Sequence, residues 1–209
     1  MDFAPMAQQC APDVHPDTLQ RIVHVESSYN PYTIGVVGAH LDRQPRNRAE
    51  AIATADWLEH NGYNYSAGLA QVNKTNFAKY GLSRETAFDA CTNLRAGGEI
   101  LKECFKRASK SYRDEQVALR AAFSCYYSGN FFTGFKQGYV LKIVSANSGV
   151  KSSLAMSGVN GIPTRSSMPV LIAGKVRKNS REDTAKPAMN TRSDPTEFAQ
   201  DPDQSAFLF

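Results

Sequence analysis

Apolar residues recur three and four positions apart from Leu19 onward, which predicts a helix over residues 17–27. Asp17 stands where a side-chain oxygen can accept hydrogen bonds from the first free N–H groups, so we expect it to cap this helix. The helix should end before Pro31, because the residue that precedes a proline avoids the helical conformation. Glu26 then falls in the last turn.

Helical spacing continues through the first part of the chain. It predicts further helices over residues 48–60, 74–80, 93–112, 113–127 and 138–146. The stretch 30–45 differs because Gly35, Gly38 and Pro45 interrupt it, so we expect a loop or a small β element there. This order of elements predicts a mainly α fold.

The composition changes near residue 148. Residues 148–209 are rich in serine, proline and charged residues, and "MPVLIAG" is their one apolar island. Such a segment buries too little surface to offset the entropy lost on ordering. The sequence therefore predicts a domain over residues 1–147, followed by a low-complexity and mostly disordered tail over residues 148–209. The end of this tail, residues 193–209, carries acids but no Lys or Arg and closes on "SAFLF".

Charge and hydropathy argue against several partners. The net charge of +4 is too small for the dense basic face of a nucleic-acid-binding protein. No run reaches the roughly 18 apolar residues that a membrane helix needs, and no signal peptide is visible in this chain. The four histidines have no metal-ligand spacing, so neither a metal nor a cofactor is expected; they are His15, His24, His40 and His60.

The four cysteines predict disulfides. Cys10, Cys91, Cys104 and Cys125 are even in number and lack a C-x-x-C spacing, which favours two bridges and an oxidising compartment. Cys104 and Cys125 lie on predicted helices joined by a short connection, and helices joined in this way pack antiparallel. Cys10 and Cys91 both precede helices. We therefore predict the pairs Cys104–Cys125 and Cys10–Cys91.

Glu26 is the first candidate for chemistry. A lone Glu-Ser pair is ordinarily a surface acid, but Glu26 has Val23 and Val25 as neighbours and stands at a helix C-terminus. The helix dipole is negative there, which disfavours a carboxylate and raises its pKa. A carboxylic acid that remains protonated near neutral pH can donate its proton to the leaving oxygen of a glycoside.

Two further motifs gain meaning beside Glu26. In "GLAQ", Gly68 can form a turn or allow a close backbone approach, and Gln71 can be a solvated residue or a donor to a sugar. In "CYYSGN", two adjacent tyrosines can serve as core and cap, or one phenol can hold the catalytic acid by a hydrogen bond. Each motif is weak alone.

The ordered set resembles a known family. "ES" on a helix, then "GLxQxN", then an "A-Y-N-x-G"-like element is similar to the pattern of lytic transglycosylases related to the soluble lytic transglycosylase catalytic domain. The resemblance spans about residues 10–146 and is close to the VirB-type branch of type IV secretion systems. It implies a lysozyme-like fold, mainly α with an α+β character, in which helices and a small β element surround a glycan cleft.

The resemblance also implies roles for individual residues. Glu26 matches the single catalytic acid/base. Substrate contacts are implied for Ser27, Gly68, Leu69, Gln71, Asn73, Tyr126 and Tyr127. We expect Gln71 to face the glycan groove opposite Glu26.

This chain departs from the family pattern in the second and third motifs. Ala70 replaces a frequent methionine, Cys125 replaces a common alanine, and Tyr127 stands where an asparagine is usual. Asn130 or the Tyr127 hydroxyl could substitute for that asparagine.

The implied activity is cleavage of the β-1,4 MurNAc–GlcNAc bond of periplasmic peptidoglycan with formation of 1,6-anhydroMurNAc, without a metal or cofactor. Such cleavage would open murein for a type IV secretion apparatus, and the tail end "SAFLF" is a hypothetical docking site for secretion-system components. Two alternatives stay open at this point. One is a goose-type-lysozyme-like muramidase that uses water, and the other is a non-catalytic glycan-binding assembly module.

Overall fold

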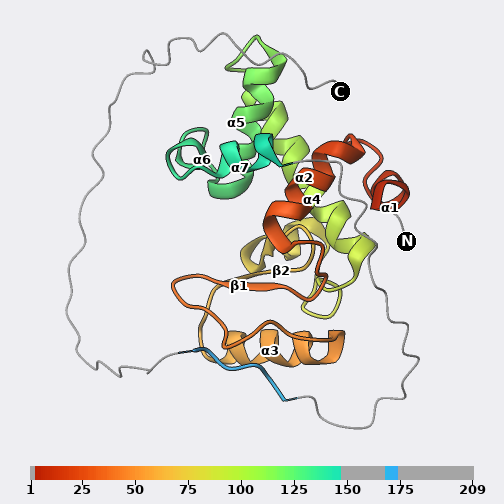
Figure 1. Cartoon of the computed structure of the whole chain (residues 1–209), viewed down its shortest axis with the longest axis vertical. Helices are drawn as coiled ribbons and strands as arrows, with labels where there is room; N and C mark the ends of the chain where they lie inside the picture. The colour runs from red at the N-terminus through yellow and green to blue at the C-terminus, as the bar shows by residue number, and fades with distance from the viewer. Residues whose placement is uncertain (1–2, 147–167, 174–209) are drawn as a thin grey trace, which may run out of the picture. The chain divides into compact units, whose positions relative to one another are not determined.

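The computed structural model describes residues 3–146 and 168–173 (Figure 1). Its elements are α1 (Phe3–Cys10), α2 (Pro16–Ser27), β1 (Ile34–Val36), α3 (Arg48–His60), β2 (Tyr65–Ala67), β3 (Val72–Asn73), η1 (Lys74–Asn76), η2 (Ala78–Tyr80), α4 (Ala90–Ala108), α5 (Glu115–Ser128), α6 (Thr133–Lys136) and α7 (Tyr139–Ser145). The predicted mainly α fold with a small β element is confirmed. None of the helices among these residues is long and apolar enough to cross a membrane.

One core joins α1, α2, α4, α5 and α7. α2 packs on α1 and α7, and α4 packs along α5. Their inward faces carry fully or nearly fully buried apolar side chains, among them Leu19, Ile22, Leu94 and Ile143. Burial of each such side chain contributes about 1.5–3 kcal/mol to the free energy of unfolding, because its apolar surface is removed from water. This core fixes the ends of α2 and α7 next to each other.

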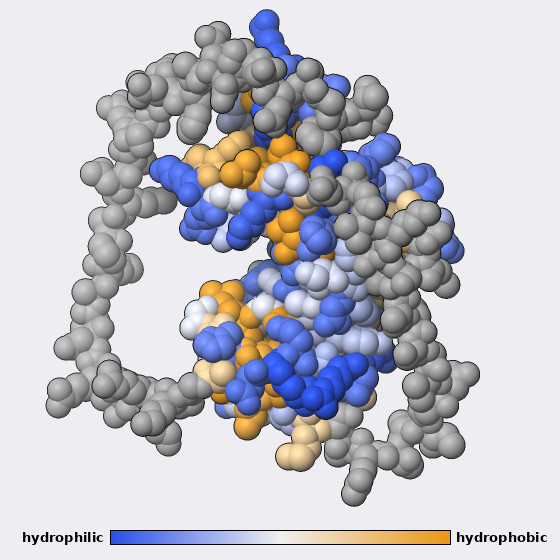
Figure 2. Space-filling view, viewed as in Figure 1, coloured by the Kyte–Doolittle hydropathy of each residue, from blue (hydrophilic) through white to orange (hydrophobic). Residues whose placement is uncertain are grey.

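A second core lies beneath the sheet. β1, β2 and β3 form an antiparallel sheet in that order, with Ile34 opposite Ala67 and Ser66 opposite Asn73. α3 covers this sheet, and the two share a buried cluster that contains Leu58 and Tyr65. The surface is hollowed between the part formed by α5–α7 and the part formed by the sheet and α3 (Figure 2).

Two local features differ from the sequence-based expectations. Asp17 does not cap α2, because the Nδ1 atom of His15 accepts the hydrogen bond from the Asp17 N–H and Pro16 takes the first helical position. Asp17 instead pairs with Arg21 one turn later. The helix α1 was not predicted; its Phe3 ring packs edge-on against Tyr29, with ring centroids 5.5 Å apart.

A short segment near the C-terminal end of the described residues belongs to the second core. Residues 168–173, which lie within the apolar island assigned to the tail, pair with the chain before α3 through a bridge between Leu41 and Ile172. Val170 is 5% exposed, and its N–H donates to Thr54 Oγ1 at 2.9 Å. The other residues of the predicted tail, and residue 147 at the predicted domain boundary, lie outside the described residues.

We predict that Val170→Ala lowers the free energy of unfolding by about 1.5 kcal/mol, because two buried methyl groups are lost. Met168→Ala is the matched control, since Met168 is 82% exposed. Urea denaturation of the full chain, followed by circular dichroism, measures both variants. Equal stability of the two variants would show that the segment does not hold the second core.

Candidate active site

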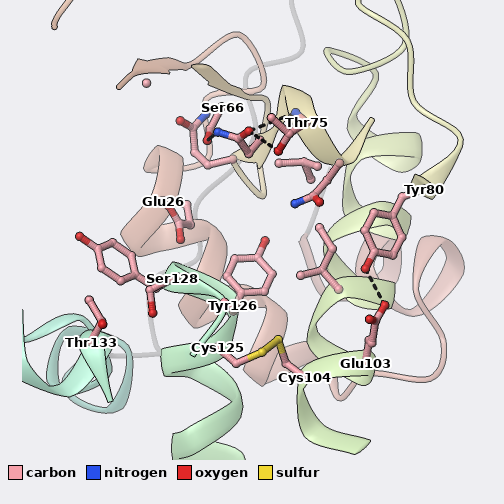
Figure 3. A pocket seen from close by; sticks show the side chains of 18 of the residues that line it. Glu26, Ser66, Thr75, Tyr80, Glu103, Cys104, Cys125, Tyr126, Ser128 and Thr133 are labelled. Atoms are coloured by element: carbon pink, nitrogen blue, oxygen red, sulfur yellow. Dashed lines mark hydrogen bonds between the residues drawn. A yellow bond between two sulfur atoms is a disulfide. The ribbon is translucent and has the colours of Figure 1, made fainter. Parts of the chain in front are cut away.

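Glu26 lines a cleft of about 790 Å³ between the sheet and the helices α4 and α5. It projects from the last turn of α2, and Tyr126 of α5 lies beside it (Figure 3). The helix ends immediately afterwards because Ser28 adopts a left-handed conformation, with φ of 49°, and returns its N–H to the His24 carbonyl. The chain therefore turns away and leaves Glu26 at the wall of the cleft.

Burial raises the pKa of Glu26 from its ordinary value of 4.5 to about 7. A hydrogen bond from the Tyr139 hydroxyl, at 2.5 Å, lowers this pKa and offsets part of the effect. The raised pKa predicted from the helix dipole is thus present, but loss of hydration is its main cause. Near neutral pH a large share of Glu26 carries the proton that a general acid needs.

Tyr139, at the start of α7, is a site residue that the sequence motifs did not reveal. Its ring stacks on Tyr127, with centroids 4.6 Å apart and planes inclined by 21°. The Tyr127 hydroxyl donates to Gln137 Oε1 at 2.6 Å. The sequence places Tyr139 after Gly138 at the start of the predicted last helix. It gives no indication that this tyrosine contacts Glu26.

Tyr126 has a different partner. Its hydroxyl donates to the Ala70 carbonyl at 2.5 Å and so connects α5 to the turn of the second motif. The phenol that holds the acid comes from α7, and not from the tyrosine pair of the third motif. Asn130, one of the two possible substitutes for the family asparagine, accepts hydrogen bonds from the N–H groups of Phe132 and Thr133.

The turn over residues 68–71 depends on Gly68 and Asn93. Gly68 has φ of 82°, and a Cβ there would lie 2.4 Å from the Ala87 carbonyl oxygen. The fully buried Asn93 donates to the carbonyls of Ala67 and Ala87, at 2.9 Å each, and accepts from the Ala70 N–H at 2.7 Å. Only glycine fits this contact between the turn and α4.

Gln71 lines the same cleft as Glu26, but its amide nitrogen is engaged. Nε2 donates to the carbonyls of Thr33 and Gly68, at 2.9 Å each. These bonds hold the side chain across the end of β1, and Gln71 itself adopts φ of 45°. Nε2, which we expected to donate to a sugar, therefore donates to backbone carbonyls. Oε1 is the atom suited to accept a hydrogen bond from a sugar hydroxyl or amide.

The structure divides the remaining predicted contacts into two groups. Asn73, Tyr126 and Tyr127 line the cleft together with Gln71. Ser27, Gly68 and Leu69 are not among its lining residues: Leu69 is fully buried in the first core, and Ser27 donates to the Val23 carbonyl. These three lie in the segments that carry Glu26 and Gln71, and they do not line the cleft themselves. Polar lining residues that sequence reasoning missed include Asn64, Ser66, Thr75 and Asn76.

Both predicted disulfides form, Cys10–Cys91 and Cys104–Cys125. The second lines the cleft and joins α4 to α5 immediately before Tyr126 (Figure 3). It therefore fixes the helix that carries the tyrosine pair. Within the described parts of the chain, no group of three or more His, Cys, Asp or Glu side chains could hold a metal ion.

A family model described as "Transglycosylase SLT domain" matches residues 4–142, which include every residue that lines the cleft. The chain belongs to the SLT transglycosylase domain family. This confirms the resemblance deduced from the three motifs.

Curated relatives of this SLT-domain chain carry the name virB1. It is 54% identical over 150 residues to "Type IV secretion system protein virB1" of Brucella abortus biovar 1 (strain 9-941), covering 69% of this chain and 63% of the relative. It is 35% identical over 147 residues to "Protein virB1" of Agrobacterium fabrum (strain C58 / ATCC 33970), covering 69% and 59%. The chain thus spans about three-fifths of the length of these relatives. No solved structure matches it.

Glu26, which is partly buried at the cleft wall, should make stability depend on pH. Its pKa is higher in the folded state, so the folded state binds more protons between pH 4.5 and about 7, and stability falls as pH rises through that window. Glu26→Gln should remove this dependence. The free energy of unfolding of the natural chain should fall by up to about 3 kcal/mol more between pH 4 and pH 8 than that of the variant. Urea denaturation at several pH values measures it, with the exposed Glu99→Gln as control. A parallel pH dependence in Glu26→Gln would contradict the assignment.

Tyr139→Phe should move the alkaline limb of the activity profile to higher pH. The hydroxyl lowers the Glu26 pKa, so its loss lets that pKa rise. The maximal rate should fall by about 10-fold or more, because the carboxyl loses a hydrogen bond that orients it and stabilises its charged form. A pH–rate profile of murein cleavage separates the two effects. A limb that stays in place or moves to lower pH would exclude Tyr139 from this role.

Proposed function

We propose that this chain is a peptidoglycan lytic transglycosylase that cleaves the β-1,4 bond between N-acetylmuramic acid and N-acetylglucosamine. The observation that carries the proposal is the Glu26 carboxyl, whose pKa is raised to about 7 at the wall of a cleft large enough for a glycan. Membership of the SLT transglycosylase family supports it. The amides and hydroxyls that line the cleft suit N-acetylated sugars.

A scarcity of carboxylates favours a scheme with one acid. Most glycosidases use two carboxyl groups that flank the scissile bond. Among the described residues that line the cleft, the second carboxylate is Glu103, which pairs with Lys79 at 2.6 Å and accepts from the Tyr80 hydroxyl at 2.8 Å. It lies across the cleft from Glu26, with Tyr126 between them (Figure 3). Glu103 is therefore a poor candidate for nucleophile or base.

The proposed reaction uses Glu26 twice. Its proton passes to the glycosidic oxygen as the C1–O bond of the muramic acid breaks. The substrate's own acetamido group stabilises the positive charge that develops at C1. The Glu26 carboxylate, held by the Tyr139 hydroxyl, then takes the proton from the C6 hydroxyl, whose oxygen bonds to C1 and closes the 1,6-anhydro ring. The Tyr139 bond is strongest when Glu26 is charged, so it stabilises the state between the two steps.

The cellular setting follows from the relatives and the cysteines. The Brucella relative is named a type IV secretion system protein, and two disulfides suit an oxidising compartment. We therefore place the activity in the periplasm, where local opening of murein would make room for a secretion apparatus. Docking of secretion-system components on "SAFLF" stays a prediction, because that segment lies outside the described residues.

Digestion of purified peptidoglycan followed by mass spectrometry tests the proposal. The products should end in 1,6-anhydroMurNAc, and Glu26→Gln should lower the rate at least about 100-fold, because the amide keeps the shape of the acid but has no proton to give. Reducing ends would instead show a muramidase that uses water. Absence of cleavage by the natural chain, with retained glycan binding, would identify a non-catalytic module.

A further inference from the structure

The charged residues of the cleft are gathered at one end. Besides Glu26, the charged side chains among its described lining residues are Lys79, Glu103 and Arg107. Glu103 and Arg107 are four residues apart on α4 and so share a face of that helix, and Lys79 of η2 pairs with Glu103. Glu103 and Tyr80 stand on the opposite side of the pocket from Glu26 (Figure 3). We refer to Lys79, Glu103 and Arg107 as the charged end.

The rest of the cleft is chemically different. Between Glu26 and the charged end, the polar lining groups are neutral amides, hydroxyls and phenols. Such groups match the hydroxyls and acetamido groups of a glycan, which carries no charge along its sugar rings. A neutral sugar gives ionised side chains no partner of opposite charge. In peptidoglycan the charges lie on the stem peptides that branch from the muramic acid lactyl groups.

The guanidinium of Arg107 is positioned by neighbouring residues in a way that suits an anionic ligand. Its guanidinium lies over the Phe131 ring, 5.4 Å from the centroid, and donates to the Gly129 carbonyl at 3.3 Å. It also donates to Cys125 Sγ at 3.5 Å, and its charge is among the causes that lower the pKa of Glu103, but the described residues form no ion pair with it. A guanidinium fixed in this way keeps further N–H donors in the planar arrangement that binds a carboxylate at two points.

The charged end also opens onto a second hollow. Lys79, Tyr80 and Glu103 line both the cleft and a neighbouring depression of about 710 Å³. That depression adds Glu99, Lys102 and Lys106 of α4, and Lys102 pairs with Asp13 at 2.6 Å and with Glu99 at 3.0 Å. The lining of the depression thus holds three lysines and two glutamates, and a chain that leaves the cleft at this end would pass Lys106 of α4.

We propose that the charged end binds the stem peptide of peptidoglycan, with Arg107 receiving a peptide carboxylate. This inference rests on the proposed function and extends it: the cleft distinguishes glycan that carries peptides from glycan that has been stripped of them. Glu103 and Lys79, which are 45% and 56% exposed, remain accessible to the ammonium and carboxylate groups of the same peptide.

The test compares two substrates that differ only in the peptide. One is soluble glycan strands with intact stem peptides, and the other is the same strands after an amidase has removed them from the lactyl groups. The natural chain should show the higher kcat/KM on the peptide-bearing strands. Arg107→Ala should lower kcat/KM on those strands by about 10-fold, mainly through KM, and by several-fold less on stripped strands. Arg107→Lys keeps the charge but loses the planar pair of N–H donors. Its kcat/KM on the peptide-bearing strands should lie between those of the natural chain and Arg107→Ala.

Lys110→Ala is the matched control, because it removes one positive charge from an exposed turn outside the cleft and should leave both substrates unaffected. Equal losses on both strands in Arg107→Ala, or no loss on either, would overturn the inference. If the natural chain cleaves neither substrate, the proposed function fails separately. Calorimetric titration of the full-length chain with a free stem tetrapeptide then decides: binding that Arg107→Ala weakens supports the inference, and absence of binding overturns it.

Discussion

The buried side chain of Asn93 is the constraint on which the cleft depends. It is fully buried and satisfies three backbone groups of residues 67–87 that water cannot reach. Each of these groups would cost about 1–3 kcal/mol if left without a partner. The bonds press the turn at Gly68 against α4, and that turn presents Gln71 to the cleft and the Ala70 carbonyl to Tyr126. The turn that follows β2 is thus joined to α4 by the Asn93 amide and to α5 by the Tyr126 hydroxyl.

The acid is prepared by the same packing that supports the fold. α2 and α7 share the first core, so the end of one helix and the start of the other meet at Glu26 and Tyr139. Burial keeps the proton on Glu26, and the hydroxyl limits how far its pKa rises. The fold accepts a carboxyl that becomes costly when ionised, because the chemistry needs a proton that can leave and return near neutral pH.

The sequence was informative where a feature is local and uninformative where it arises from contact between distant segments. The end of α2 at Ser27, and with it the placement of Glu26, follows from the nearby proline, and the cysteine pairs follow from the order of the helices. Tyr139 and Asn93 carry no motif, because Glu26 lies 113 residues from Tyr139, and the Ala70 and Ala67 groups lie 23 and 26 residues from Asn93. Strands of two or three residues are too short to show alternation.

The segment 168–173 lies outside the residues that the family model matches, yet it is part of the folded unit. The family match ends at residue 142, yet Val170, which is buried and donates its N–H to the Thr54 hydroxyl, comes from beyond that border. A chain cut at the border would keep every residue of the cleft while exposing apolar surface on α3 and an open backbone edge at Leu41. Open edges and bare apolar surface invite association with other chains. Residues 4–142 of this chain, if isolated, would therefore associate through surface that has no part in the cleft.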